Sequence, residues 1–390
     1  MTRWRSQHFR HQSPPGVSSE VLKNAVRTAE ITEQANQLVP PVFSLGHLAH
    51  YTGVEYGVLR SIVARADVPT YRNFVIHKRP AVEGRARYRK ISVPSAPLML
   101  VQRWINAHIL QKAKPDAAST AFASGCDIRS GAEIHCGSRW LIKVDVQDFF
   151  SSINEISVYR VFRALGYQPL ISFELARLST QLGRKPDRSC WENFRPPPSP
   201  YPWPRSRAPV IGSYWNRHIG YLPQGAPTSP MLANMVMKEH DKTLRGLAED
   251  WGFVYSRYAD DMTFSTREES SREICKFIVS DCYRVLKSIG LSPNLSKTHI
   301  VPPGARKIVL GLNVDREQPR LSRDFKLRMR QHLHFVELAT GPTQHAAMRG
   351  FRSVTGLRHH LEGLAAFASQ IEPEYGASLR DRLVAVDWPA

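Results

Sequence analysis

Two adjacent aspartates, Asp260 and Asp261, lie between two short apolar segments, residues 253–255 and 262–264. The pattern predicts two strands joined by a turn at the aspartates, and such a turn can bring one carboxylate onto a shared face. Two like charges beside apolar strands are costly unless cations neutralise them. We therefore expect cations to neutralise this pair.

A third carboxylate, Asp145, ends the apolar stretch 141–145, which predicts a buried strand. Three carboxylates that converge from separate strands suit hard divalent cations, and Mg²⁺ fits best. Two such ions can activate an attacking hydroxyl and stabilise the leaving oxygen of a phosphoryl transfer. An isolated Asp-Asp pair is more often a plain surface turn, so the prediction depends on what else the sequence carries.

The charge balance narrows the class of partner. The 390 residues include 53 Lys and Arg against 34 Asp and Glu, a net charge of +19. This surplus favours a polyanionic partner such as nucleic acid, although a basic soluble protein would also carry it. No apolar stretch approaches the ~18 residues of a membrane span, so we expect a cytoplasmic protein without a membrane partner. The five cysteines form no CxxC pair, which argues against a zinc site.

The periodicity of the chain predicts a mixture of helices and strands. Residues 43–66 predict two short helices, either a helix-turn-helix or, as we favour, a two-helix packing unit. The segment 184–220 is dense in Pro, Arg and Trp, which prevents regular structure and indicates a surface insertion. Strands are predicted within 71–93, 141–150, 253–265 and 307–314, and helices within 20–37, 97–113, 154–181, 221–249, 268–289 and from 323 onwards.

Three motifs resemble those of reverse transcriptases. Tyr258–Asp261 resembles the YxDD signature, and Lys143–Phe150 resembles the motif that supplies the other metal-binding aspartate. Leu222–Pro230 (LPQGAPTSP) resembles the LPQGxxxSP motif of the same family. They occur in the family's order, and the resemblance runs from about residue 75 to 380.

Within this family the sequence is most similar to bacterial retron-type enzymes. The segments that carry this similarity are 145–153, 232–234, 257–265 and 371–375. Two subgroup motifs depart from the family pattern: NAxxH is represented by Gly131–His135, with Gly in place of Asn, and VTG by Val309–Gly311. Neighbouring defence-associated lineages therefore remain open alternatives.

The resemblance implies an α+β right-hand polymerase with fingers, an antiparallel palm sheet and a helical thumb. The expected parts are an N-terminal arm and helical region (1–70), fingers (71–140), a palm (141–305, with the insertion 184–220), and a primer grip with helical thumb (306–390).

The resemblance also implies roles for single residues. Asp145, Asp260 and Asp261 match the triad that binds two Mg²⁺ ions, and Lys297 matches a lysine near the triphosphate that can protonate the departing pyrophosphate. The residues that match dNTP-binding positions are Arg87, Arg89, Phe150, Gln224 and Gly225. Simpler explanations of these residues remain: a solvated basic face for the arginines, core packing for the phenylalanine, and a structural turn for Gln224 and Gly225.

The C-terminal region matches the parts that hold the primer. Leu310 and Gly311 occupy the place of the primer-gripping hairpin. The basic segment that follows suits phosphate contacts, with Arg323, Lys326 and Arg330 as candidate nucleic-acid-binding residues. An ordinary exposed helix face explains any single one of these nearly as well.

The implied function is RNA-directed DNA synthesis of retron type in the bacterial cytoplasm. A cognate structured noncoding RNA would be template and primer, dNTPs the substrates, and RNA-linked single-stranded DNA the product. Antiphage defence with an effector protein would follow. Two alternatives stay open: a defence polymerase of another lineage, protein-primed or untemplated, and a catalytically silent nucleic-acid-binding scaffold.

Overall fold

A computed structural model describes residues 17–66, 69–82, 85–183, 218–338 and 341–389, with the side chains of 78–82 and 85–87 left out. The chain forms two compact units. The first consists of Met1–Ser124, Val146–Thr243 and Tyr283–Pro293, and the second of Gly125–Asp145, Leu244–Cys282 and Asn294–Ala390. Helices and antiparallel sheets occur together, so the expected α+β class is confirmed.

Helices dominate the first unit, and side-chain caps start several of them. Ser18, Ser44 and Asn154 each accept a hydrogen bond from a backbone N–H of the following turn. The two short helices expected within 43–66 are present, and Gly53 ends the first of them with a φ of 67°. The helices are α2 (Ser19–Ala35), α3 (Leu45–Thr52), α4 (Tyr56–Val63), α5 (Ala96–His108), α7 (Phe149–Ser152), α8 (Glu155–Ala164) and α9 (Pro169–Ser179).

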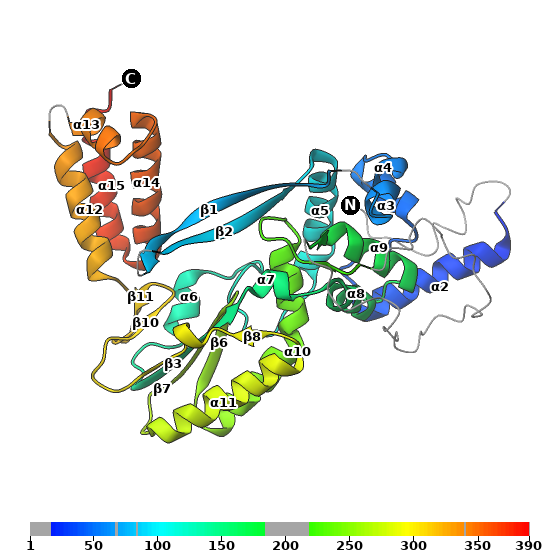
Figure 1. Ribbon diagram of the computed structural model, residues 1–390, viewed down its shortest axis with the longest axis horizontal. Coiled ribbons are helices and arrows are strands. Elements are labelled where there is room, and N and C mark those ends of the chain that lie inside the picture. The colour runs from blue at the N-terminus through cyan, green and yellow to red at the C-terminus, as the bar shows by residue number, and fades with distance from the viewer. Residues whose placement is uncertain (1–16, 67–68, 83–84, 184–217, 339–340, 390) are drawn as a thin grey trace. The chain divides into compact units, whose positions relative to one another are not determined.

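A long two-stranded ribbon belongs to the same unit. Its strands β1 (Tyr71–Val82) and β2 (Arg85–Pro94) pair antiparallel and extend from the region of α5 (Figure 1). Phe74 faces Ile91 and Ile76 faces Arg89 across the pair. The expected strands within 71–93 are therefore confirmed.

The ends of the predicted insertion are held together. Residues 184–217 lie outside the described part of the chain, but β4 (Gln181–Leu182) pairs antiparallel with β5 (Gly220–Tyr221). Gly220, the last residue of the expected insertion, is already part of this ladder.

A buried carboxylate fixes the base of this ladder. Glu155 is fully buried and accepts hydrogen bonds from the Gly220 N–H (3.0 Å) and the Thr180 hydroxyl (2.9 Å). Its charge is paired with Arg65 (2.5 Å) and Arg177 (3.2 Å). Burial acts to raise the pKa of Glu155, but the two guanidinium groups outweigh it and hold the pKa below its usual value.

A mixed-length antiparallel sheet carries the predicted carboxylates. Its strand order is β6-β7-β3-β8, and β9 also pairs with β3. The strands are β3 (Trp140–Gln147), β6 (Val254–Tyr258), β7 (Asp261–Thr266), β8 (Ser292–Pro293) and β9 (His299–Val301). The helices connected to these strands are α6 (Ile128–Glu133), α10 (Ser229–Asp250) and α11 (Arg272–Ser288).

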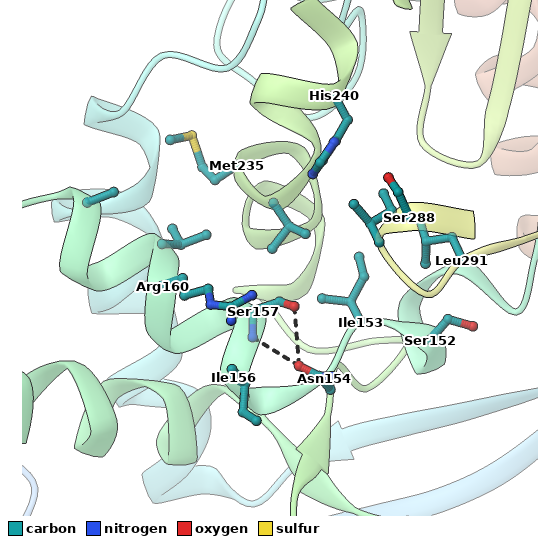
Figure 2. Close-up of a pocket in the computed structure, with 14 residues that line it drawn as sticks. Ser152, Ile153, Asn154, Ile156, Ser157, Arg160, Met235, His240, Ser288 and Leu291 are labelled. Carbon is teal, nitrogen blue, oxygen red and sulfur yellow. Dashed lines mark hydrogen bonds between the residues drawn. The ribbon is translucent and has the colours of Figure 1, made fainter. Parts of the chain in front are cut away.

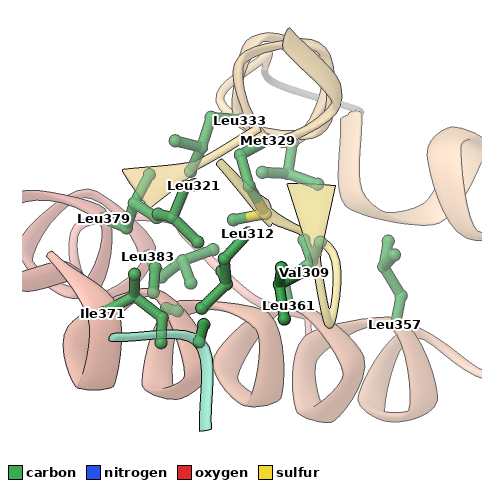
Figure 3. Close-up of a cluster of buried hydrophobic side chains, with 14 of the residues drawn as sticks. Val309, Leu312, Leu321, Met329, Leu333, Leu357, Leu361, Ile371, Leu379 and Leu383 are labelled. Carbon is green, nitrogen blue, oxygen red and sulfur yellow. The ribbon is translucent and has the colours of Figure 1, made fainter. Parts of the chain in front are cut away.

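A helical bundle completes the second unit. Buried leucines of α12, α14 and α15 pack with Val309 and Leu312 of a small sheet (Figure 3), and each fully buried leucine contributes about 1.5–3 kcal/mol. The sheet is β10 (Ile308–Val309), β11 (Leu312–Asn313) and β12 (Arg320–Leu321), and the helices are α12 (Arg323–Val336), α13 (Gly341–Met348), α14 (Val354–Ile371) and α15 (Pro373–Val384). None of the helices in the described ranges is long and apolar enough to cross a membrane.

Candidate active site

The two adjacent aspartates lie where the alternating pattern predicts a turn. Tyr258 pairs with Asp261, so Ala259 and Asp260 form the connection between β6 and β7. Ala259 has a φ of 57°, a left-handed conformation that costs a residue with a side chain roughly 1–2 kcal/mol. The fully buried Arg257 donates a hydrogen bond to the Ala259 carbonyl oxygen (2.9 Å), which stabilises this turn.

The sheet register brings Asp145 to the same place. Asp145 of β3 lies directly opposite Asp261 of β7, and directly opposite residues share one face of a sheet. Lys143 lies two residues before Asp145 and therefore on that face as well. Its Nζ lies 2.9 Å from Asp261 Oδ2. This ion pair offsets the repulsion that two opposed carboxylates would otherwise cause.

A second cation neutralises Asp145. Lys297 Nζ lies 2.7 Å from Asp145 Oδ2, and the Asn294 side-chain amide donates to Oδ1 at 3.0 Å. The Asn294 backbone N–H also donates to the Asp145 carbonyl oxygen (2.7 Å). The short helical turn Leu295–Lys297 and its N-cap residue Asn294 thus hold both the backbone and the side chain of Asp145.

Asp260 has a different electrostatic environment. Burial raises its pKa above the usual value, and the carboxylates of Asp145 and Asp261 raise it further. Across the described residues, no three His, Cys, Asp or Glu side chains are gathered closely enough to hold a metal ion. Lys143 and Lys297 occupy oxygens of two carboxylates instead. The donor chemistry, carboxylate oxygen, still fits a hard divalent cation.

His135 holds the strands that carry the aspartates. Its Nδ1 lies 2.7 Å from Ser265 Oγ of β7, and its Nε2 lies 2.7 Å from Ser256 Oγ of β6. Burial, together with the charge of Lys143, lowers its pKa to about 3, so the ring is neutral and bridges the two hydroxyls. The sequence showed His135 only as the end of an imperfect motif, without this role.

The LPQGAPTSP segment forms a turn against β2. The Gln224 carbonyl oxygen accepts a hydrogen bond from the Ser92 N–H (2.7 Å). Gly225 has a φ of 109°, and a Cβ added there would lie 2.9 Å from Ile91 Cγ2. Only glycine fits at this position, because both the backbone conformation and the close approach exclude a side chain.

The other predicted dNTP-binding residues also lie in the first unit. Arg89 is an exposed residue of β2, and Arg87 lies two residues earlier on the same strand, its side chain outside the described atoms. Phe150 of α7 is partly buried, with its ring centroid 5.5 Å from that of Phe149. Asp145, Asp260, Asp261 and Lys297 all belong to the second unit.

The predicted primer grip is a tight hairpin turn. Leu310 and Gly311 connect β10 with β11 and have φ angles of 51° and 81°, as a type I′ turn requires. Leu310 is partly buried against the apolar core of the bundle, and this packing offsets its backbone strain. Gly311 is exposed.

The basic residues of α12 fall into two groups. Arg323 and Arg330 are exposed. Lys326 is paired with Glu372 (2.5 Å), and its Nζ lies 5.0 Å from the centre of the Tyr375 ring. The stretch 371–375 therefore binds the start of α12, and Lys326 has a structural partner.

A pocket of the first unit contains none of the predicted site residues. It has a volume of about 650 Å³ and lies between α8, α10 and the segment after α11 (Figure 2). Asn154 Oδ1 at its edge accepts hydrogen bonds from the Ser157 backbone N–H and hydroxyl. The remaining lining is mostly aliphatic, with Arg160 and His240 as its basic residues.

Comparison with known proteins gives consistent matches. Residues 76–314 match the family model for reverse transcriptase (RNA-dependent DNA polymerase). The retron Ec86 reverse transcriptase of Escherichia coli is 28% identical over 346 residues, which are 87% of this chain and 92% of that protein. The retron Mx65 reverse transcriptase of Myxococcus xanthus is 31% identical over 330 residues, 85% of this chain and 69% of that protein. A telomerase structure from Candida albicans aligns with a TM-score of 0.43 and 13% identity, covering 82% of this chain and 56% of that one.

Proposed function

The chain belongs to the retron-type reverse transcriptases and is an RNA-directed DNA polymerase with a right-hand polymerase fold, and from this premise we propose what it makes. It copies part of a cognate structured noncoding RNA into single-stranded DNA that stays linked to the RNA. The RNA is both template and primer, and the product acts in antiphage defence with an effector protein. The similarity to retron enzymes over most of the chain supports this proposal.

The proposed catalytic group is Asp145, Asp260 and Asp261. Reverse transcriptases use divalent metal ions, and these three residues would hold two Mg²⁺, which supply positive charge for phosphoryl transfer. Lys143 and Lys297 neutralise two of the carboxylates beforehand and would have to release them. Lys297, once released, would give a proton to the departing pyrophosphate.

The proposed nucleotide-binding group consists of residues of the first unit. Arg87 and Arg89 grip the triphosphate, because guanidinium groups form paired hydrogen bonds with phosphate oxygens. Gln224 and Gly225 form the turn that contacts the nucleotide, and the glycine lets this turn pack closely against Ile91 and Ser92 of β2. Phe150 excludes the 2′-OH of a ribonucleotide through its ring.

The proposed primer- and template-binding group lies in the second unit. Leu310 and Gly311 form the rigid turn that supports the primer end. Arg323 and Arg330 are exposed and can contact phosphates. Lys326 contributes charge on the same helix but is already bound to Glu372.

One observation carries the catalytic proposal: Asp145 lies directly opposite Asp261, and Asp260 follows the strained Ala259 in the adjoining turn. Asp260→Asn removes the charge and keeps the shape. We expect it to abolish dNTP incorporation on a primed RNA template while RNA binding and the melting temperature persist. Incorporation within about tenfold of wild type, a loss of less than ~1.4 kcal/mol, would contradict the assignment.

Asp148→Asn is the matched control. Asp148 is exposed three residues after Asp145, and its side chain makes no capping hydrogen bond. Asparagine also tolerates its left-handed φ of 47°. This variant should incorporate dNTPs as the wild type does, so a loss in Asp260→Asn alone is specific to that carboxylate.

The identity of the RNA needs a separate experiment. Nucleic acid that copurifies with the chain is digested with RNase and DNase in separate samples, and each remainder is sequenced. DNA whose sequence is complementary to part of a bound RNA, and which is joined to it, is the expected result. Bound DNA without a complementary RNA would instead favour a protein-primed or untemplated lineage.

A further inference from the structure

Ser92 connects three elements of the first unit. It lies in β2 and is 1% exposed. Its backbone N–H donates to the Gln224 carbonyl oxygen (2.7 Å), and its hydroxyl donates to Asn73 Oδ1 of β1 (2.6 Å). Ser92 therefore attaches β2 to its partner strand and to the turn that carries Gln224.

Gln181 of β4 orients this serine. Its amide Nε2 lies 2.9 Å from Ser92 Oγ and 3.1 Å from Tyr221 Oη. A primary amide has two N–H donors, so one group binds both hydroxyls. Because Ser92 Oγ accepts from Gln181, its own proton is directed at Asn73. Gln181 is 6% exposed, so water cannot easily replace these bonds.

The turn and the strand are in direct contact beside this network. A Cβ on Gly225 would lie 2.9 Å from Ile91 Cγ2 and 3.2 Å from the Ser92 carbonyl oxygen. A shift of Ser92 and β2 towards the turn must therefore displace the turn. Arg89 lies three residues before Ser92 on that strand.

We propose that Gln181 is a positioning residue for the incoming dNTP. Through Ser92 it sets the spacing between the strand that carries Arg89 and the turn that carries Gln224. The inference rests on the proposed function, because it takes these two residues as nucleotide contacts. Gln181 itself lies outside the motifs that resemble the family's.

Gln181→Leu tests this role. The substitution removes both donors but keeps the backbone pairing of Gln181 with Tyr221. Ser92→Ala is the second variant, since it deletes the same hydroxyl from the other side. Gln168→Leu is the matched control, because it also removes a glutamine side-chain amide of the first unit, here a partly buried one that donates to the Phe43 carbonyl oxygen.

The assay measures incorporation on a primed RNA template over a range of dNTP concentrations. Gln181→Leu and Ser92→Ala should each raise the KM for dNTP about tenfold, because misplacing a binding group weakens the bound geometry. Both should keep kcat and the Kd for primer–template within about twofold of wild type. The double variant should raise KM no further, because both changes act through one hydroxyl. Gln168→Leu should leave KM unchanged.

Different results overturn different claims. A purely structural role would lower kcat through a smaller folded fraction and leave KM unchanged, and that result in Gln181→Leu overturns the inference alone. Additive increases in KM in the double variant also overturn it, because the two residues would then act separately. Failure of the wild type to incorporate dNTPs overturns the proposed function, and the inference with it.

Discussion

His135→Leu tests how the hairpin that carries Asp260 and Asp261 is held. The substitution replaces the ring by an apolar group of similar size and so removes the ring nitrogens that bridge Ser256 and Ser265. These two serines are 4% and 2% exposed, so water cannot readily replace the hydrogen bonds that their hydroxyls lose in the variant. The expected result is a marked loss of stability at neutral pH.

The size of the loss follows from the burial. Each buried polar group left without its partner costs about 1–3 kcal/mol, so two hydroxyls cost roughly 4 kcal/mol together. A variant that also carries Ser256→Ala and Ser265→Ala removes the unpaired groups. It should recover most of the loss, because exchanging all partners for apolar groups is nearly neutral.

The loss should also depend on pH. The pKa of His135 is lowered to about 3 in the folded chain, against 6.5 for an unperturbed histidine. A lowered pKa gives stability that is complete above 6.5 and is lost as the pH falls towards 3. At pH 5 the unfolded chain gains about 2 kcal/mol from protonating this histidine. The wild type carries this histidine and His135→Leu does not. The difference in unfolding free energy between the two proteins should therefore shrink from about 4 to about 2 kcal/mol.

Urea unfolding followed by circular dichroism at pH 8 and pH 5 measures these differences. The three proteins to compare are the wild type, His135→Leu and the triple variant. The reasoning is refuted if the gap between the first two is the same at both pH values. It is also refuted if the triple variant is as unstable as His135→Leu.

Four further predictions concern single side chains. Phe150→Ala should lower the ratio of kcat/KM for dNTP over rNTP, because the lost ring leaves room for a 2′-OH; an unchanged ratio would mean that Phe150 only packs. Ala259→Gly should raise the melting temperature in calorimetry, because glycine adopts the φ of 57° without strain, and a lower value would contradict the strain. Arg330→Gln should reduce the slope of log Kd for RNA against log salt by about one. Lys326→Gln should instead lower the melting temperature, because it breaks the pair with Glu372. A lower melting temperature in Arg330→Gln together with a reduced salt slope in Lys326→Gln would contradict the structure.

The catalytic strands could be predicted because their signals are local. Alternating apolar residues around Asp260 and Asp261 indicate strands, and two strands this close in sequence have to pair as a hairpin. The same holds for the ribbon within 71–93. Family motifs added the expectation that Asp145 joins them, and the register of β3 with β7 agrees.

The groups that neutralise and hold the aspartates could not be predicted in the same way. Lys143 reaches Asp261 only because of one particular strand register, and Asn294 reaches Asp145 across 149 residues of sequence. His135 bridges two serines that are more than a hundred residues away. Side-chain pairs of this kind depend on tertiary contacts, and neither propensity nor periodicity carries information about them.

Because the short β4–β5 ladder closes the base of the segment between residues 183 and 218, the length of that segment has little effect on the stability of the rest of the chain. Residues 183 and 218 are brought near each other by the pairing of Gln181 with Tyr221 and by the bond from Gly220 to Glu155. Closing a longer segment over such a base costs only about 0.6 kcal/mol for each doubling of its length. The same base makes the chain suited to fragment complementation: pieces 1–183 and 218–390, expressed as separate polypeptides, should reassemble there without a covalent link.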